Sequence, residues 1–274
     1  KESFFKYLEE LKNGRPIQYI TNSQEFMGLN FYVDENVLIP QPDTEILVEN
    51  TINVVKELMK DKEFASEGVN PLAPEPDIRE KNNIIEILDL CTGSGAIAVS
   101  IEDYIFNKNE TKEIVEIYAS DVSKKALEIA KKNAIANNKN SKINFILSDM
   151  FDEITTKDFD IIVSNPPYIE TQTIGRLSKE VQNEPILALD GGKDGLEYYR
   201  IIAKEAKKHL KDDGYILLEI GYNQKEKVMN IFDKEKYLNL VCKKDLSGND
   251  RIIECRYSGK GRKICLFHRK WKKN

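Results

Sequence analysis

The feature that most constrains the fold of this chain is a regular alternation, between residues 84 and 220, of apolar runs and stretches with helical spacing. Each apolar run is five to seven residues long and rich in isoleucine, leucine and valine, which is typical of strands buried on both faces. The repeated order of strand, helix and strand predicts an α/β fold in which helices cover both faces of a parallel sheet.

The elements of this sheet are predicted from the same pattern. The strands are expected at residues 84–90, 114–119, 143–147, 159–164 and 215–220, and the helices at 94–106, 123–137 and 196–210. Two further apolar runs, 238–243 and 251–256, flank a turn at 247–250. We expect these two runs to form an antiparallel pair that closes the sheet.

The residues before the sheet have mixed patterns. Residues 3–11 predict one short helix. From residue 16 to residue 39 the pattern is strand-like, which we interpret as a hairpin region; its apolar runs are 18–21, 25–27 and 30–33.

A longer helix is expected after this region. Asp43 is suited to cap it, and apolar residues recur at helical spacing to about Lys60. Residues 61–83 contain three prolines and nine charged residues with few apolar anchors. We therefore expect a mobile connection there.

Charge is unevenly distributed along the chain. Residues 259–274 contain seven lysines or arginines and no acid, whereas the remainder has 34 basic against 46 acidic residues. Such a basic tail is suited to phosphate contacts with nucleic acid. Short charged chain ends are more often solvated, and we favour that interpretation.

Several classes of protein are disfavoured by what the sequence lacks. The four cysteines have no CxxC spacing and only two histidines could join them, so no metal site is expected. A disulfide framework is typical of small secreted chains, which this is not. No apolar run approaches the ~18 residues of a membrane span, and no secretion signal begins the chain, which favours a cytoplasmic protein without a membrane partner.

A glycine-containing loop, residues 89–95, follows the first predicted strand. Ligands of open α/β sheets bind at the carboxyl ends of the strands, and the glycines let the backbone approach a ligand closely. The pattern also matches the dinucleotide fingerprint G-x-G-x-x-A, and a turn needed only for packing fits as well. Asp121, after the second strand, is suited to accept hydrogen bonds from ribose hydroxyls in either type of cofactor, or to cap the next helix.

Asp149, after the third strand, adds to this pattern. Its carboxylate is suited to accept a hydrogen bond from the exocyclic amine of adenine. Met150 and Phe151 provide apolar flanks for the ring. Acids after each of the first three strands therefore favour a bound cofactor over a packing turn.

The segment Asn165-Pro166-Pro167-Tyr168, after the fourth strand, is the most informative stretch. Two consecutive prolines remove two N–H donors and fix two φ angles, which is useful where a carbonyl must be held rigidly toward a ligand. A simple turn explains one proline and an asparagine, but not this combination at the functional edge of a sheet. We predict a site that holds an amide or amine nitrogen.

The chemistry of methyl transfer fits this segment. If the two hydrogens of an amide nitrogen are donated to the Asn165 side-chain oxygen and the Pro166 carbonyl, its lone pair is oriented toward a sulfonium methyl group. Tyr168 is suited to stack on the planar amide and exclude water. The rate gain would come mainly from alignment, and no general base is required. We predict Asn165, Pro166 and Tyr168 as catalytic residues, with Pro167 completing the substrate site.

These motifs resemble class I methyltransferases and, within them, the HemK/PrmC family of protein-(glutamine-N5) methyltransferases, which act on peptide chain release factors. The similarity covers residues 15 to about 257. It includes RPIQYI (15–20), VLIPQPDTE (37–45), TGSGAIA (92–98), SNPPYI (164–169), EP (184–185), LDGGKDGL (189–196), YR (199–200), EIG (219–221) and KDLSGNDR (244–251).

The resemblance implies a function in translation termination: methylation of the glutamine in the Gly-Gly-Gln loop of release factors, with S-adenosylmethionine as the donor and S-adenosylhomocysteine as the product. It implies a Rossmann-like, mostly parallel seven-stranded sheet with an antiparallel final strand. Three regions are expected: a helix remnant and hairpin (1–35), the methyltransferase domain (36–258) and the basic tail (259–274). The cofactor-binding residues expected from pattern and resemblance together are Asp89, Cys91, Thr92, Gly93, Ser94, Gly95, Asp121, Asp149, Met150, Phe151 and Asn165.

The chain departs from the family pattern in three places. Gln41 and Asp43 stand where the family usually has arginine and glutamate. Cys91 replaces a common glycine, which the loop tolerates if φ is negative there. Only 14 residues precede Arg15, so the N-terminal helical domain of the family is almost absent and helix 3–11 is expected to be its remnant.

Three other functions remain open on the sequence. A nucleic-acid methyltransferase acting on an exocyclic amine of adenine or guanine needs the same two acceptors, but also a basic face, and the body of this chain is acidic. A dinucleotide oxidoreductase leaves the Asn-Pro-Pro-Tyr segment without a role. A catalytically silent, ribosome-associated binding module is the third.

Overall fold

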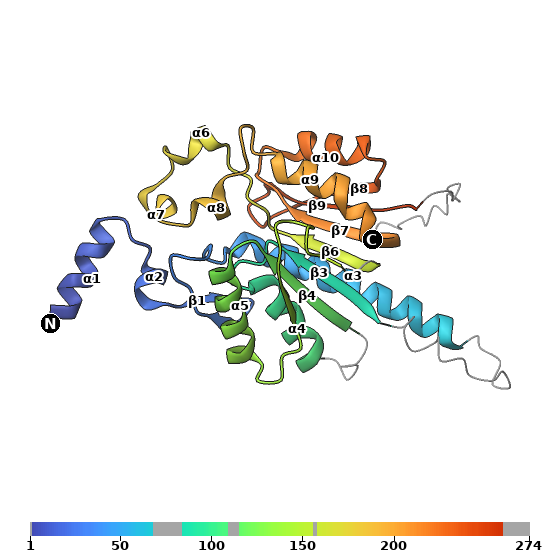
Figure 1. The fold of residues 1–274 in the computed structure, drawn as a ribbon, viewed down its shortest axis with the longest axis horizontal. Helices are drawn as coiled ribbons and strands as arrows, with labels where there is room; N and C mark the ends of the chain where they lie inside the picture. The colour runs from blue at the N-terminus through green and yellow to red at the C-terminus, as the bar shows by residue number, and fades with distance from the viewer. Residues whose placement is uncertain (1, 68–83, 109–114, 156–157, 260–274) are drawn as a thin grey trace.

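The structure is a computed structural model that describes residues 2–67, 84–108, 115–155 and 158–259. A seven-stranded sheet runs through the molecule in the order β5-β4-β3-β6-β7-β9-β8 (Figure 1). Its strands are β3 (Ile85–Leu90), β4 (Val115–Asp121), β5 (Asn144–Leu147), β6 (Phe159–Ser164), β7 (Leu210–Glu219), β8 (Leu238–Lys244) and β9 (Asp250–Arg256). Strands β3 to β7 pair in parallel, and β9 lies antiparallel between β7 and β8. The predicted α/β sheet and its antiparallel closing pair are confirmed.

Helices cover both faces of the sheet because successive strand residues point to opposite sides (Figure 1). On one face Ile85 and Ile87 pack into a buried cluster with side chains of α3 (Pro42–Glu67), α4 (Ala96–Lys108) and α5 (Lys124–Asn137). On the other face Leu88 and Leu90 pack with side chains of α9 (Glu197–Glu205) and α10 (Lys225–Lys234). Ser123 caps α5, since its hydroxyl accepts a hydrogen bond from Ala126 N.

The strand order reverses at β3. From β3 the chain builds outward through β4 to β5, and it then returns to add β6 on the other side of β3. In an open α/β sheet such a reversal leaves a crevice beyond the carboxyl ends of the two central strands. The loops after β3 and β6, which carry the predicted glycine loop and the Asn-Pro-Pro-Tyr segment, meet at this crevice.

The hairpin is confirmed in part. Strands β1 (Gln24–Phe26) and β2 (Leu29–Phe31) pair antiparallel. Met27 and Gly28 between them have φ of 53° and 76°, which is the two-residue turn that matches the twist of a hairpin.

The strand predicted at 18–21 is wrong, because these residues form the short helix α2 (Ile17–Thr21). Pro16 precedes the helix with φ of −55°, and Asn22 ends it in the left-handed conformation. Tyr19 is buried by the tertiary fold, and its hydroxyl donates to the Val37 carbonyl at 2.6 Å. A long-range contact of this kind decides the local structure and is not visible in the local pattern.

The helix predicted from Asp43 begins one residue earlier, so Asp43 lies in its first turn and is not the cap. Proline suits this first position because the N–H it lacks has no helical partner there. Helix α3 continues to Glu67, and the connection expected to be mobile is therefore helical over residues 61–67, which contain no proline or glycine. Residues 68–83 of that expected connection lie outside the described residues.

Smaller differences complete the comparison. The short N-terminal helix is present as α1 (Glu2–Lys12). The helix predicted over 196–210 ends at Glu205, followed by the 3-10 turn η2 (Ala206–Lys208) and by β7, which begins at Leu210. The pairing of β6 with β7 shifts in register there, so the first part of β7 does not have a regular strand pattern. The basic tail from residue 260 onward lies outside the described residues.

Candidate active site

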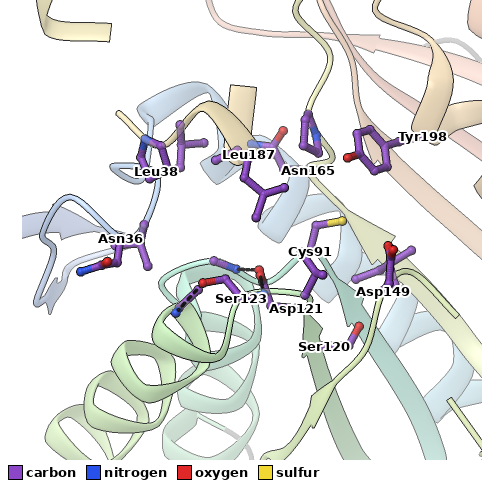
Figure 2. Close-up of a pocket in the computed structure, with 18 of the residues that line it drawn as sticks. Asn36, Leu38, Cys91, Ser120, Asp121, Ser123, Asp149, Asn165, Leu187 and Tyr198 are labelled. Carbon is purple, nitrogen blue, oxygen red and sulfur yellow. Dashed lines mark hydrogen bonds between the residues drawn. The ribbon is translucent and has the colours of Figure 1, made fainter. Parts of the chain in front are cut away.

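A cavity of about 310 Å³ opens at the carboxyl ends of the central strands (Figure 2). The predicted site residues that line it are Cys91, Gly93, Asp121, Asp149, Met150, Asn165 and Pro167. They come from the loops after four different strands, which the fold brings to one edge of the sheet. Clefts of this size are typical of small-molecule sites.

The loop after β3 turns sharply at three residues. Cys91, Gly93 and Gly95 all have positive φ, at 62°, 55° and 82°. The expectation of a negative φ at Cys91 is wrong, so this cysteine holds a left-handed conformation that glycine adopts more easily. At Gly95 a Cβ would lie 3.0 Å from the Cβ of Ala130, and glycine therefore lets α4 approach α5 closely.

Asp121 is the best-anchored acid of the cavity. Its two carboxylate oxygens accept hydrogen bonds from Gly93 N at 2.9 Å and Ser123 N at 2.8 Å. It thereby ties the glycine loop to the start of α5 while its side chain lines the cavity. Burial raises the pKa of the Asp121 carboxyl above its ordinary value.

Asp89, Thr92, Ser94 and Gly95 do not line the cavity, although they were predicted to bind the cofactor. Asp89 is fully buried and accepts from the Thr92 hydroxyl at 2.5 Å and from Ala98 N at 3.2 Å. These bonds join the end of β3 to the glycine loop and to the first turn of α4. Burial raises the pKa of Asp89 to about 7.

The three residues predicted to hold an adenine ring are placed differently from one another. Asp149 is exposed at the edge of the cavity (Figure 2). Met150 also lines the cavity. Phe151 points away and stacks on His209, with ring centroids 5.1 Å apart. The structure therefore leaves Met150 as an apolar wall and uses Phe151 in the core.

Part of the cavity lining was not predicted from sequence. Val37 and Leu38 line it from the segment before α3. Tyr198 lines it from α9, opposite Leu38 in the close-up (Figure 2). Leu187 comes from α8 (Ile186–Leu189), one of three one-turn helices between β6 and α9. The other two are α6 (Thr171–Ile174) and α7 (Lys179–Gln182), and their shortness explains why no helical period was visible. The 37–45 motif was a signal of function, but nothing in it pointed to this cavity.

The Asn-Pro-Pro-Tyr loop is held against a glycine-rich segment. A Cβ on Gly191 would lie 2.7 Å from the Tyr168 Cα, and a Cβ on Gly195 would lie 2.4 Å from the Tyr168 carbonyl oxygen. The Gln224 side chain donates to that same carbonyl at 2.9 Å. The LDGGKDGL motif thus has a structural reason, since only glycine permits this approach of two backbones.

A second cavity, of about 240 Å³, lies on the other side of Asn165. Pro166 and Tyr168 line it together with Gln41, Glu219 and Arg251. The two cavities share the residues Leu38, Asn165 and Ala188 in their walls. Asn165 therefore stands where a ligand in one cavity would meet a ligand in the other.

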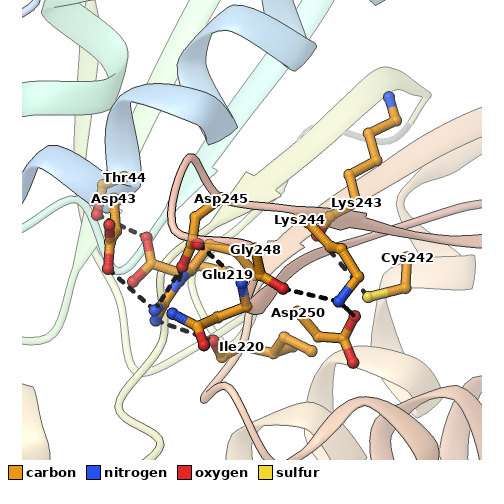
Figure 3. A network of polar contacts seen from close by, with 12 residues as sticks. Asp43, Thr44, Glu219, Ile220, Cys242, Lys243, Lys244, Asp245, Gly248 and Asp250 are labelled. Carbon is orange, nitrogen blue, oxygen red and sulfur yellow. Dashed lines mark hydrogen bonds and ion pairs between the residues drawn. The ribbon is translucent and has the colours of Figure 1, made fainter.

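A buried polar network backs the second cavity (Figure 3). Glu219 is 2% exposed and accepts hydrogen bonds from the Thr44 hydroxyl at 2.6 Å and the Tyr168 hydroxyl at 3.2 Å. Arg251 pairs with Asp43 at 2.9 Å and with Asp245 at 3.0 Å. Asp43, which stands where the family usually has the longer glutamate, therefore still reaches Arg251 of β9. Burial raises the pKa of Glu219 to about 7 and raises the pKa of Tyr168 as well.

Two other kinds of feature are absent from the described part of the chain. It contains no group of three or more histidine, cysteine, aspartate or glutamate side chains arranged to hold a metal ion. None of its helices combines the length and the apolar character that a membrane crossing needs.

A mostly parallel sheet with one antiparallel strand, a glycine loop after its first central strand and a cavity at the reversal point define a class I methyltransferase fold. Comparison with known proteins agrees. The family described as methyltransferase small domain matches residues 77–243. The hMettl16 catalytic domain, solved in complex with the MAT2A 3′UTR hairpin 6, has a TM-score of 0.57 at 16% identity, covering 85% of this chain and 76% of that one, and is similar in fold.

Relatives in sequence narrow the class. A release factor glutamine methyltransferase of Clostridium acetobutylicum is 37% identical over 255 residues, which cover 92% of this chain and 79% of the relative. A protein of the same name from Clostridium botulinum is 37% identical over 259 residues, covering 93% and 81%. The chain belongs to the release factor glutamine methyltransferase family, the HemK/PrmC family.

Proposed function

We infer that this chain transfers a methyl group from S-adenosylmethionine to the side-chain amide nitrogen (N5) of the glutamine in the Gly-Gly-Gln loop of peptide chain release factors. The relatives named release factor glutamine methyltransferase support the substrate. The observation that carries the inference is the junction at Asn165, where two cavities of suitable size adjoin.

The first cavity suits the methyl donor. Its walls include Leu38, Leu90 and Leu187, and its floor presents the Asp121 carboxylate held by two backbone N–H groups. An adenosine has one apolar ring and one pair of adjacent hydroxyls, which matches this combination of walls and acid. S-adenosylmethionine supplies an electrophilic methyl group on a sulfonium sulfur. Asp149, which is exposed and lines the cavity, would accept a hydrogen bond from the adenine amine.

The second cavity suits the acceptor amide. Asn165, Pro166 and Tyr168 line it. The side chain of Asn165 and the backbone of Pro166 each have a carbonyl oxygen that would accept a hydrogen bond, and Tyr168 adds an aromatic ring. Two acceptors fix both hydrogens of a planar amide, so its nitrogen faces the neighbouring cavity. The nitrogen forms a bond to the methyl carbon as the carbon–sulfur bond breaks, and one amide proton then leaves to solvent. The chain contributes mainly alignment, which is where large rate gains are available without a general base.

Transfer of a labelled methyl group tests this proposal. Purified chain is incubated with labelled S-adenosylmethionine and, in parallel, a release factor, ribosomal RNA or DNA. We expect label on the release factor alone, and Asn165→Ala to lower kcat at least about 100-fold with cofactor affinity largely retained. Label that appears only on nucleic acid would establish the exocyclic-amine alternative instead.

A further inference from the structure

The orientation of the Asn165 side chain is a problem that the fold must solve. A carboxamide is planar, and its oxygen and its NH₂ group have nearly the same size. Methyl transfer to an amide needs the oxygen toward the acceptor, because the acceptor nitrogen brings hydrogens. If the group turned by 180°, two sets of donors would face each other. Some contact in the protein must therefore distinguish the two ends.

The contacts behind Asn165 make that distinction. Its Nδ2 atom lies 3.2 Å from Thr44 Oγ1, and Thr44 Oγ1 lies 2.6 Å from Glu219 Oε2. Two oxygens this close need a proton between them, and an ionised carboxylate has none to give. The single proton of the Thr44 hydroxyl is therefore donated to Glu219. What remains on Thr44 toward Asn165 is a lone pair, which accepts only from an NH₂ group.

We propose that Thr44 and Glu219 are positioning residues that hold the Asn165 amide with its oxygen toward the methyl acceptor. The buried Glu219 carboxylate can only accept, so it takes the proton of the Thr44 hydroxyl, and the hydroxyl oxygen in turn accepts from the Asn165 NH₂ group. This inference rests on the proposed function for the identity of the acceptor. The three side chains come from α3, β7 and the loop after β6, so the relay forms only in the folded molecule.

The relay needs Glu219 in its ionised form. Burial is the largest influence on this carboxyl and raises its pKa to about 7. The hydroxyls of Thr44 and Tyr168, the latter donating at 3.2 Å, and the Arg251 guanidinium lower the pKa, whereas Asp43 of α3 raises it. The ionised form therefore prevails above about pH 7. Below that pH a protonated Glu219 can donate to Thr44, which then donates to Asn165 Oδ1 and favours the turned amide, so kcat should fall as the pH drops through about 7.

Paired substitutions of the hydroxyl test the relay. Thr44→Val removes the hydroxyl with little change of shape, whereas Thr44→Ser keeps it. Thr51→Val is the matched control, because Thr51 is buried in the same helix and donates only to the Leu47 carbonyl. We expect Thr44→Val to lower kcat about 10-fold or more with cofactor affinity unchanged, and the serine and Thr51 variants to stay near the wild type. The acid fall in kcat should disappear in Thr44→Val.

Reversing the relay gives a second readout that structural damage does not mimic. In Glu219→Gln, an NH₂ group on the side that faces Thr44 donates to it, so the Thr44 hydroxyl turns to Asn165 and the amide presents NH₂ to the acceptor. A release factor with glutamate in place of its loop glutamine carries an acceptor carboxylate. Because the turned Asn165 amide donates to a carboxylate, we expect this altered release factor to inhibit the Glu219→Gln enzyme more strongly than it inhibits the wild-type enzyme. The Glu219→Gln enzyme should also have a lower kcat on the normal release factor.

A readout without turnover separates this inference from the proposed function. The Asn165 side-chain NH₂ signals, identified by their absence in Asn165→Asp, should exchange slowly with solvent in the wild type and Thr44→Ser and rapidly in Thr44→Val. Wild-type kcat and slow exchange in Thr44→Val would overturn the relay and leave the function intact. Slow wild-type exchange with no methylation of release factor would overturn the function alone.

Discussion

At the scale of single residues, Asp121 makes the clearest contribution to the donor cavity. It lines the cavity and also ties Gly93 N and Ser123 N together through its two oxygens. Removal of its carboxylate therefore breaks the tie between the glycine loop and the start of α5 and, on the proposed function, also a contact to the cofactor. From its place after a strand, the sequence predicted that this acid contacts a cofactor or caps the next helix, but it did not indicate the bond to Gly93 N.

We expect Asp121→Ala to weaken S-adenosylmethionine binding by about 10-fold or more, because hydrogen bonds to a charged group are worth ~1.5–3 kcal/mol. Calorimetric titration of the cofactor measures the effect. Asp149→Ala is the comparison, because Asp149 is exposed at the edge of the cavity and its substitution should weaken cofactor binding less. Equal affinity of Asp121→Ala and wild type would mean that the cofactor does not contact this acid.

Cys91 leads to a prediction about stability. Its φ of 62° places a side chain in a conformation that costs on the order of 1 kcal/mol for residues other than glycine. We expect Cys91→Gly to be more stable to urea than Cys91→Ala, because both variants lose the sulfur contact with Met150 at 3.9 Å and only alanine keeps the strain. A Cys91→Ala variant as stable as Cys91→Gly would show that the turn carries no strain.

At the scale of elements, the loop after β6 depends on the segment that supports it. Ile169 N donates to the Leu189 carbonyl and Gly191 N donates to the Ile169 carbonyl, so the two segments pair briefly like strands. Rigid prolines set the shape of the loop, and this pairing sets its position. The sequence showed both motifs, but it gave no sign that one packs on the other.

Gly191→Ala should displace the loop, because its Cβ would lie 2.7 Å from the Tyr168 Cα. A misplacement of a fraction of an ångström is enough to lower kcat about 10-fold or more while cofactor affinity is largely kept. Gly175→Ala is the control, since nothing lies within 4 Å of the added carbon there. Steady-state kinetics on a release factor check both variants, and equal kcat values would argue against support of the loop by Gly191.

Local pattern succeeded where an element is long and buried, and failed where tertiary contacts decide. The strands of the central sheet were predicted because each is a short run dominated by isoleucine, leucine, valine and aromatic residues. The short helix α2 was mistaken for a strand, because burial of Tyr19 against Val37 fixes it. The start of β7 at Leu210 was missed for a related reason, since it depends on pairing with Phe159 of a distant strand.

At the scale of the whole molecule, the order of the strands is what creates a site. The reversal at β3 brings the glycine loop, the acid after β4 and the Asn-Pro-Pro-Tyr loop to one edge. That much followed from the sequence, because parallel strands place their carboxyl ends together. The second cavity did not follow, because its wall draws on Gln41, Glu219 and Arg251 from three separate parts of the chain.

The central claim is that a donor and a glutamine amide meet at Asn165. The most direct measurement is tandem mass spectrometry of a release factor after incubation with this chain and S-adenosylmethionine. We predict one added methyl group, located on the side-chain nitrogen of the glutamine in the Gly-Gly-Gln loop, and none with Asn165→Ala. An unmodified loop glutamine, or a methyl group on another residue of the release factor, would contradict it.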